Sequence, residues 1–412
     1  MNSNTLDSQR IIQEIIECLN EVIPPADSVP LHEPFFGGEE WDCLRECLSS
    51  GFVSSIGPFV DTFEKKLAVF TGARYAIAVV NGTSALHISL KISGVREHDE
   101  VIVPAMTFVA TANAVTYCNA TPHFADISSE TLCLDPEKLR EHLAGIVKKT
   151  PDGDSINRKT GQRIKAVVVV HSFGHPAEME KLLSVCTEFN LALIEDAAES
   201  LGSYYKGQHT GTIGSLGTLS FNGNKIITTG GGGAILTNDP LLAQTAKHLT
   251  TTAKIPHPWR FFHDQAGYNY RMPNLNAALG CAQLDQLPKF LAAKRALATK
   301  YSSAFERVKG VTFFLEPSFA TSNYWLNALL IDPALAQNRD DLLDTCNQLG
   351  FKLRPAWELM HTLPMYTHCP RMDLSTAETT VRRLINLPSS VSLMIGPGTS
   401  APQLERRSAK EN

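Results

Sequence analysis

The chain has 412 residues and a formal net charge of −5, from 37 lysines and arginines and 42 aspartates and glutamates. This length exceeds what one compact core usually holds, so it predicts a large domain with a smaller companion. Hydrophobic residues make up 43% and charged residues 19%, which is typical of a globular protein and excludes a disordered scaffold. Because no basic excess is available to bind a phosphate backbone, nucleic acid is not an expected partner.

The cysteines and the N-terminal residues bear on where the protein works. The nine cysteines are scattered, and the closest pair, Cys43 and Cys47, has no second pair at zinc-ligand spacing, so we expect reduced thiols and no metal site. The first residues lack the cationic and apolar regions of a secretory signal, and no apolar run approaches the ~20 residues that span a bilayer. We therefore expect a cytoplasmic protein without a membrane partner.

The predicted elements begin with a helix over residues 6–22, which ends before Pro24-Pro25. We expect it to be an appendage, an N-terminal helical extension covering residues 1–30. From residue 31 onward, helical patterns alternate with short β-rich runs, which indicates a layered α/β domain. The runs AVVVV and LALIE are apolar almost throughout, as expected for central strands covered by helices on both faces. The predicted strands of this domain are residues 76–80, 101–103, 121–125, 166–170 and 191–194.

The remaining segments complete the expected organisation. The polar segment over residues 150–163 predicts an exposed loop within the same domain. After about Pro288 a long helical pattern leads into strands at 311–314 and 325–331, which fits a smaller α/β domain. We therefore expect a large domain over residues 31–288 with a mostly parallel mixed sheet between helices, a small C-terminal α/β domain over 289–393, and a flexible tail over 394–412.

The first candidate site is the turn Asn81-Gly82-Thr83-Ser84, which follows the first predicted strand and opens a helical segment. The free N–H groups at a helix start face an anion, and the Thr83 and Ser84 hydroxyls add donors, so this turn suits a phosphate group. Taken alone, the turn is more typical of an N-cap that satisfies its own helix, because threonine and serine are common caps.

The second candidate is Asp196, at the carboxyl end of an otherwise apolar strand. Open α/β sheets bind ligands at that edge, where a carboxylate can hold a ring nitrogen protonated. A strand-end aspartate that caps the next helix is at least as common for a lone residue. Strand alternation predicts that the neighbouring Glu195 points to the opposite side of the sheet.

The third candidate is Lys225, in the segment Ser220-Phe221-Asn222-Gly223-Asn224-Lys225, which precedes four consecutive glycines at 230–233. A lone lysine is usually exposed to solvent. Here small and turn-forming neighbours let the backbone pass close to a planar ligand, and desolvation would lower the lysine pKa toward the range that imine chemistry requires. The glycines also fit a hairpin or bulge before a strand at 234–237, and both interpretations can hold together.

The order of these three signals is more specific than any one of them. Pyridoxal phosphate (PLP) requires a phosphate anchor, a partner for its ring nitrogen and an amine that forms an imine. Thr83-Ser84, Asp196 and Lys225 supply these functions in that order, each next to the end of a predicted strand. The sequence therefore predicts a PLP enzyme.

At this point the sequence resembles the sugar aminotransferase family named after DegT and StrS, which has the fold type I architecture of PLP enzymes. The resemblance covers roughly residues 31–393 and implies glutamate and a nucleotide sugar as substrates. It depends on landmark motifs at residues 81–86, 104–108, 195–199, 220–225 and 267–272.

The resemblance assigns a role to individual residues of this chain. Lys225 is then the residue that carries the cofactor as a Schiff base, and Asp196 pairs with the pyridinium nitrogen. The Gly82 turn with Thr83, Ser84 and Ser220 contacts the cofactor phosphate.

Further positions are implied in the same way. Phe108 stacks on the cofactor ring, and Arg271 binds a substrate anion; a core aromatic and a surface ion pair are the alternatives for these two. Asn269 matches a position that reaches the phosphate of the neighbouring subunit's cofactor, which implies a homodimer with shared active sites. The chain departs from many relatives at two positions: histidine or glutamine is common in place of Glu199, and glutamate is common in place of Gly231. Because a carboxylate close to the cofactor's ring oxygen would repel it, Glu199 is expected only to lie beside the cofactor.

A narrower similarity is to the branch that aminates sugars for legionaminic acid and related nonulosonic acids, based on residues 31–38, 221–225 and 257–259. That branch implies a UDP- or GDP-linked 4-keto-6-deoxy-2-acetamido sugar, aminated by a ping-pong mechanism. Two rivals remain. One is a PLP-dependent sugar dehydratase on the same fold, although such relatives typically replace the lysine with histidine. The other is a non-catalytic protein that binds nucleotide sugars.

Overall fold

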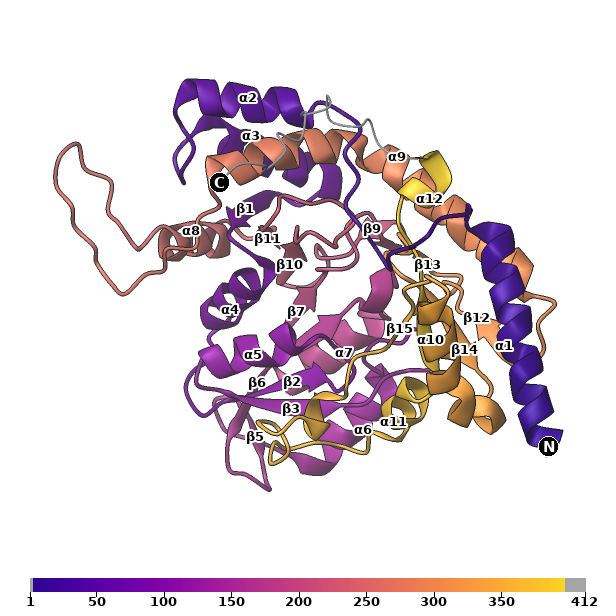
Figure 1. The fold of residues 1–412 in the computed structure, drawn as a ribbon. Coiled ribbons are helices and arrows are strands. Elements are labelled where there is room, and N and C mark those ends of the chain that lie inside the picture. The colour runs from indigo at the N-terminus through magenta and orange to yellow at the C-terminus, as the bar shows by residue number, and fades with distance from the viewer. Residues whose placement is uncertain (1–2, 397–412) are drawn as a thin grey trace, which may run out of the picture.

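The computed structural model describes residues 3–396, and a mixed sheet forms its centre (Figure 1). Seven strands follow one another in the order β1-β11-β10-β7-β6-β2-β3, and within this series only β11 runs antiparallel to its neighbours. The predicted α/β class with a mostly parallel sheet is confirmed. The strands are β1 (Tyr75–Val79), β11 (Gly233–Thr237), β10 (Leu216–Ser220), β7 (Ala192–Asp196), β6 (Arg163–Val170), β2 (Glu100–Pro104) and β3 (Thr121–Ala125).

Apolar side chains leave this sheet on both faces. Along β6, Val168 belongs to one core cluster and its neighbours Val167 and Val169 to another, as the alternation of a strand requires. Two-sided burial explains the nearly continuous apolar runs of the central strands. Helices α4 (Gly82–Ile92), α5 (Val109–Tyr117) and α8 (Pro240–Thr250) cover one face, and α3 (Pro58–Thr71), α6 (Pro136–Ile146), α7 (Met179–Phe189) and part of α9 (Asn274–Phe305) cover the other.

The strands predicted from apolar runs are confirmed to within three residues at each end, whereas β10 was not predicted. This strand contains Gly217, which breaks the apolar pattern. A Cβ atom at Gly217 would lie 2.0 Å from the Gly211 carbonyl oxygen, so two backbone segments approach one another too closely for a side chain.

The polar segment over residues 150–163 is not simply an exposed loop. It contains β5 (Ser155–Asn157), which pairs with β4 (Val147–Lys149) and with the start of β6. Ser155 and Asn157 are buried, and the Asn157 amide donates to both oxygens of the buried Glu100 at 3.1 and 2.9 Å. The turn formers in this segment belong to a hairpin at the amino ends of the parallel strands, far along the sheet from the predicted site.

The C-terminal part contains a second sheet, of four antiparallel strands. These are β12 (Val311–Phe313), β14 (Asn327–Ile331), β16 (Leu384–Leu387) and β15 (Arg354–Pro355), accompanied by α10 (Arg339–Gln348), α11 (Ser375–Val381) and α12 (Ser392–Ile395). A small sheet of β8 (Tyr204–Tyr205), β9 (Gln208–His209) and β13 (Ala320–Thr321) joins it to the main body. Met394 and Ile395 of the predicted tail pack against the core, and residues 397–412 lie outside the described residues.

Helix α9 differs from its prediction at its start. The sequence pattern predicted that the helix starts after about Pro288. In the structure it begins at Asn274 and continues through Pro288. Leu284 and Leu287 pack into the core of the large part, whereas Leu297 and Tyr301 pack into that of the C-terminal part. One helix is therefore shared by both cores (Figure 1).

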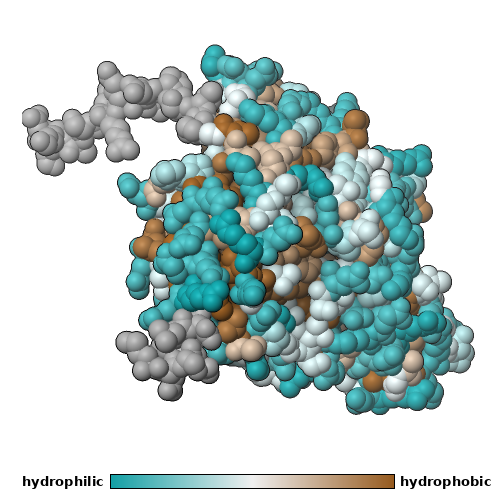
Figure 2. Space-filling model, turned by 90° about the vertical axis from the view of Figure 1, so that its right-hand side faces the viewer, coloured by the Kyte–Doolittle hydropathy of each residue, from teal (hydrophilic) through white to brown (hydrophobic). Residues whose placement is uncertain are grey.

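Helix α1 (Ser3–Val22) is confirmed as a helix, but it is not an appendage. Ile15, Cys18 and Leu19 are fully buried in the same core as Tyr301 of α9 and Leu342 of α10. The molecular face on the α1 side is mostly hydrophilic, with apolar patches between the polar residues (Figure 2). The helix thus completes the C-terminal core with one face and presents polar side chains on the other. The helix α2 (Glu40–Ser50) packs on α9 at the far end of the molecule.

We predict that Leu19→Ala lowers the free energy of unfolding by about 2–5 kcal/mol, the usual cost of a buried leucine truncated to alanine. Gln13→Ala, at an exposed position of the same helix, is the matched control and should change stability by less than about 0.5 kcal/mol. Urea unfolding followed by circular dichroism measures both. Equal, small effects of the two variants would mean that α1 is an appendage after all.

All nine cysteines are free thiols; eight are buried and Cys43 is half-buried, as expected from their scattered positions. Within residues 3–396, no helix combines the length and the apolar character needed to cross a bilayer.

Candidate active site

The carboxyl ends of β1, β7 and β10 meet at one edge of the sheet and line a cavity of about 390 Å³. This edge is where ligands bind to open α/β sheets. The turn after β1 brings Gly82 and Thr83 to the cavity, β7 brings Asp196, β10 brings Ser220, and the loop after β10 brings Lys225. The three motifs that lie far apart in the sequence therefore converge in space.

The turn after β1 is both a helix cap and an anion cradle. The Asn81 side chain accepts a hydrogen bond of 2.7 Å from the Ser84 N–H, so asparagine supplies the N-cap of α4. The N-terminal turn of α4, with its positive end of the helix dipole, opens toward the cavity at Gly82 and Thr83. Ser84 is buried and is not among the residues that line the cavity.

Close packing holds this turn against the neighbouring strands. A Cβ atom at Gly82 would lie 3.0 Å from Ser220 Cβ, so the two predicted phosphate contacts touch one another. A Cβ atom at Gly233 in β11 would lie 2.4 Å from the carbonyl carbon of Asn81 and 2.6 Å from the Gly82 nitrogen. Position 233 must therefore be glycine for the 81–82 turn to keep its place.

We predict that Gly233→Ala displaces the 81–82 turn, lowers the free energy of unfolding by about 1–3 kcal/mol through overpacking, and weakens cofactor binding. Gly223→Ala is the matched control, because a Cβ atom there meets nothing within 4 Å; both properties should stay at the wild-type values. Titration with PLP followed by absorbance, together with urea unfolding, tests the pair. Unchanged PLP affinity in the Gly233 variant would contradict the close packing of this turn.

Asp196 is a buried carboxylate that faces neutral donors. Its Oδ2 accepts a hydrogen bond of 2.9 Å from the Thr111 hydroxyl, and its Oδ1 accepts one of 3.2 Å from the Ala198 N–H. Burial raises the pKa of the Asp196 carboxyl, while these two bonds favour its charged form. A cationic ring nitrogen at this position would supply the missing opposite charge. No sequence motif identified Thr111, because its role depends on the start of α5 lying at the end of β7.

Glu195 points to the other side of the sheet, as alternation predicted. Its carboxylate accepts hydrogen bonds from the N–H groups of Gly211, Ile213 and Gly214 at 2.6–2.7 Å, and it contacts His171 Nε2 at 2.9 Å. These bonds, foremost that of His171, offset the burial and lower the pKa of the carboxyl. Glu195 thus stabilises the 211–214 loop and takes no part in the cavity.

Lys225 extends into the cavity with only 13% of its side chain exposed. Its Nζ lies 3.3 Å from Glu199 Oε1 and 4.0 Å from the centroid of the Trp325 ring, so an ion pair and a cation–π contact hold the amine. The Trp325 indole N–H donates to the Asn224 carbonyl at 2.7 Å, which fixes the loop next to the lysine. The lysine is therefore not a surface residue.

Glu199 lines the cavity and is paired with Lys225 there. Burial raises the pKa of Glu199, and Lys225 stabilises its charged form. Its Oε2 accepts a hydrogen bond of 2.8 Å from the Phe173 N–H. Phe173 has a φ of 58°, a left-handed conformation that costs a residue with a side chain about 1–3 kcal/mol, and this conformation aims its N–H at Glu199.

The remaining predicted residues divide into two groups. Phe108 lines the cavity and is 54% exposed, which leaves its ring accessible to a ligand. Asn269 and Arg271 do not line it; they border a separate cavity beside Lys247 and Lys254. Arg271 Nη2 lies 3.6 Å from Asp61 Oδ1, so within one chain Arg271 forms a weak surface ion pair.

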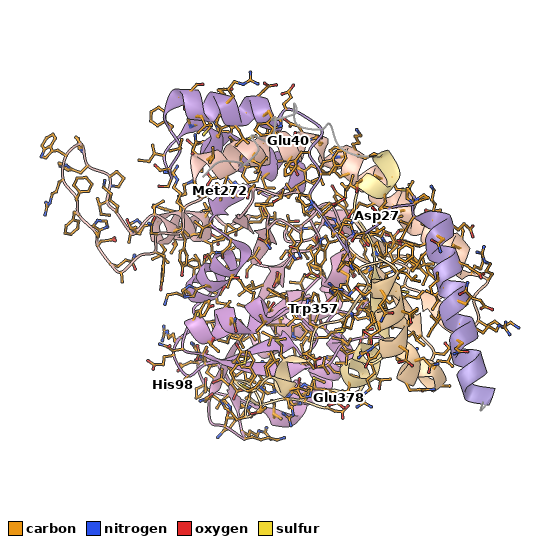
Figure 3. The ribbon with its side chains drawn as sticks, viewed as in Figure 1. Asp27, Glu40, His98, Met272, Trp357 and Glu378 are labelled. Carbon is orange, nitrogen blue, oxygen red and sulfur yellow. The ribbon has the colours of Figure 1, made fainter. Side chains whose placement is uncertain are left out.

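Two tryptophans complete the cavity, and the sequence patterns did not identify either as a site residue. Trp325 follows Asn323, whose side-chain oxygen accepts the Trp325 N–H at 2.8 Å and whose amide donates to the Glu199 carbonyl at 2.9 Å. Trp357 stacks on Phe173 at 4.9 Å and lies between the main sheet and the C-terminal elements (Figure 3). Only tertiary structure brings these aromatic walls to Lys225.

The cavity fits pyridoxal phosphate. The helix start at Thr83 and the Ser220 hydroxyl at the end of β10 suit its phosphate. The buried Asp196 has only neutral hydrogen-bond donors where a ring nitrogen would lie, and the Lys225 amine lies in the same cavity. These are the three groups by which a protein holds and activates this cofactor.

The comparisons with known proteins agree with this geometry. The chain is 38% identical over 364 residues to the GDP-perosamine synthase of Caulobacter vibrioides, which covers 87% of this chain and 92% of that protein. The solved structure of the aminotransferase TlmJ from Streptoalloteichus hindustanus has a TM-score of 0.78 at 28% identity, covering 90% of this chain and 97% of the other. DesI, solved with its TDP-sugar product, has a TM-score of 0.78 at 29% identity, covering 89% of both chains.

The match to a family covers most of the chain. Residues 36–396 match the DegT/DnrJ/EryC1/StrS aminotransferase family, in agreement with the fold type I architecture and with the resemblance found in the motifs. The protein is therefore a member of the DegT/DnrJ/EryC1/StrS aminotransferase family and a pyridoxal-phosphate-dependent sugar aminotransferase.

Proposed function

We propose that this enzyme transfers the amino group of glutamate to a UDP- or GDP-linked 4-keto-6-deoxy-2-acetamido sugar and yields the 4-amino sugar in a ping-pong reaction. The observation that carries the proposal is the convergence of Lys225, Asp196 and the Gly82 turn on one cavity. The GDP-perosamine synthase relative and the DesI structure with a TDP-sugar product support a nucleotide-linked sugar as the acceptor. The motifs shared with the legionaminic acid branch support the acetamido sugar.

The roles of the residues follow from their positions. Pyridoxal phosphate, when bound, supplies a reactive carbonyl carbon and a ring that withdraws electrons from the substrate's α-carbon. Lys225 holds it covalently and, once displaced by the incoming amine, moves the proton between the donor's α-carbon and the cofactor. Asp196, kept in place by Thr111, holds the ring nitrogen protonated. Thr83 and Ser220, which line the cavity, bind the phosphate, and Ser84 supports the turn by donating its N–H to Asn81.

Glu199 and Trp325 give the displaced lysine a defined position. The Lys225 amine, when not bound to cofactor, lies 3.3 Å from Glu199 Oε1 and 4.0 Å from the Trp325 centroid. Both contacts keep the amine inside the cavity that would hold the cofactor, where it would take up and return the proton. Phe108, which lines the same cavity and is accessible there, would stack on the ring.

A homodimer with shared active sites completes the proposal. Asn269 and Arg271 lie outside the cavity of their own chain, which is expected if they serve the neighbouring subunit's phosphate and substrate. The segment between α8 and α9 projects from the body (Figure 1), and its Trp259 and Phe261 are each 80% exposed. Large exposed aromatic side chains on a projecting segment favour a protein partner, and a second copy of this chain fits that role.

The test is to incubate the protein with PLP, isotopically labelled glutamate and a panel of 4-keto nucleotide sugars, and to identify labelled product by mass spectrometry. We expect label in one acetamido sugar linked to UDP or GDP. Transfer to a sugar without the acetamido group would overturn the branch assignment alone. Loss of a hydroxyl from the sugar without gain of nitrogen would identify a dehydratase, and no absorbance change on adding PLP would identify a non-catalytic binding protein.

A further inference from the structure

A second cavity, of about 380 Å³, adjoins the one that contains Lys225. The two cavities share three wall residues: Asn224, Trp325 and Trp357. The second cavity lies on the side of the C-terminal sheet, where Arg354 in β15 and Asn386 in β16 also line it. Arg354 and Asn386 are direct cross-strand partners, so their side chains leave the same face of that sheet.

Arg354 is the unpaired cation of these two cavities. Among the described residues, Lys225 is paired with Glu199, whereas Arg354 is in no ion pair. Its Nη1 donates to Asn347 Oδ1 and to the Leu353 carbonyl, both at 2.8 Å, which anchors one arm of the guanidinium. The other nitrogens remain available for a ligand, and a guanidinium binds a carboxylate with paired hydrogen bonds.

Two polar side chains in the same cavity have atoms without hydrogen-bond partners. Both ring nitrogens of His32 and the Oδ1 of Asn386 are buried without a hydrogen bond, and the Asn386 side chain is 3% exposed. Leaving such groups unsatisfied costs about 1–3 kcal/mol each, so their arrangement indicates a polar ligand. Burial lowers the pKa of His32 well below its usual value, so the ring is neutral and offers one N–H. The Asn386 amide N–H donates to the Pro355 carbonyl at 3.4 Å, so its unpaired atom is the acceptor oxygen.

The wall between the two cavities is held in place. The fully buried Lys294 donates to the carbonyl oxygens of Trp325 and Ser389 at 2.6 and 2.5 Å. The Leu31 carbonyl accepts the Ser389 N–H at 2.7 Å, which attaches the segment carrying His32 to the end of β16. The donor set of the second cavity is therefore preorganised relative to Trp325 and Lys225.

We infer that the second cavity is the subsite for a carboxylate of the amino donor: Arg354 pairs with it and His32 donates to it, while the donor's amine points past Trp325 to Lys225. The inference rests on the proposed function, since it names where glutamate binds. In the first cavity Lys225 is paired with Glu199, so the unpaired guanidinium of Arg354 is the cation that the two cavities offer to an acidic substrate. The other anion of the reaction is the diphosphate of the nucleotide sugar. The experiment below distinguishes binding of the donor carboxylate from binding of this diphosphate.

The probes are glutarate, a dicarboxylate without an amine, and the two half-reactions of the PLP-loaded enzyme. Calorimetry measures glutarate binding, and absorbance follows the reaction with glutamate and, separately, that of the glutamate-treated enzyme with the keto sugar. The variants are Arg354→Gln and Arg354→Lys. Arg371→Gln is the matched control, because Arg371 is also exposed, also donates to a backbone carbonyl, and is in no ion pair within the described residues.

For Arg354→Gln we expect the dissociation constant of glutarate and the glutamate concentration that gives half-saturation to rise about 10- to 100-fold. This is the usual effect of losing one charged hydrogen-bonded pair. The limiting rate and the keto-sugar half-reaction should stay within threefold, Arg354→Lys should recover part of the affinity, and the control should match wild type. An effect confined to the keto-sugar half-reaction would assign the site to the diphosphate and overturn the inference, as would unchanged glutarate binding. If wild type itself does not react with glutamate, the proposed donor is wrong and the subsite fails with it.

Discussion

Replacing Lys225 with alanine should abolish amino transfer, with turnover falling by at least about 10³-fold, because the variant loses both the covalent attachment and the group that moves the proton. The absorbance band of the bound cofactor should change, since the link to the protein is gone. Borohydride reduction followed by peptide mass analysis should find the cofactor attached to the peptide containing Lys225 in wild type and to no lysine in the variant.

The control for this experiment is Lys181→Ala, which removes a surface lysine paired with Glu178. It should leave the turnover and the cofactor attachment unchanged. Circular dichroism establishes that the Lys225 variant is folded. Turnover within about tenfold of wild type, a barrier change of only ~1.4 kcal/mol, would show that Lys225 is not the attachment residue.

Replacing Asp196 with asparagine should lower turnover by about 10²- to 10⁴-fold, while the cofactor-free protein keeps its stability or gains some. Asparagine retains the shape and the hydrogen bond to Thr111 but cannot neutralise a cationic ring nitrogen. Because burial raises the pKa of Asp196 in the folded chain, its ionisation opposes folding. The protonated carboxyl therefore favours the folded state. This stabilisation is fully present below the unfolded pKa of about 3.8 and is lost as the pH rises through the folded pKa.

Two measurements separate this role from a structural one. Urea unfolding of cofactor-free protein between acidic and neutral pH should show a smaller stability decrease in Asp196→Asn than in wild type. Thr111→Val, which removes only the neutral hydrogen bond, should lower turnover by about tenfold, much less than the loss of the charge. If asparagine at this position supports turnover close to wild type, Asp196 does not pair with the ring nitrogen.

The sequence alone predicted the parts of the fold and the site that depend on local pattern. Apolar runs identified the central strands, and the order of Thr83, Asp196 and Lys225 identified the cofactor, because each lies just after a strand whose carboxyl end reaches the same edge. Convergence at that edge follows from the parallel topology, so the chain order of the motifs was sufficient.

The parts that were missed depend on contacts between distant segments. Trp325 belongs to the C-terminal part and becomes a wall of the cavity only because Asn323 and Lys294 attach it there. Strand β10 was not predicted because Gly217 interrupts its apolar pattern. Glycine is needed there because the Gly211 backbone lies too close for a side chain. The role of α1 was misjudged because its apolar stripe does not reveal which core it completes. No local pattern records any of these contacts.

The length of helix α9 has a consequence for how the protein can be divided. Its N-terminal half carries Asn276, which donates to the carbonyls of Thr229 and Gly231 beside Lys225, and its C-terminal half carries Lys294, which holds Trp325 and Ser389. Dividing the chain near Pro288 would interrupt this helix and expose an apolar face on each fragment. The two halves are therefore not exchangeable modules: a chimera that borrows the C-terminal part of a relative must take the whole of α9, together with α1, as a single inherited unit.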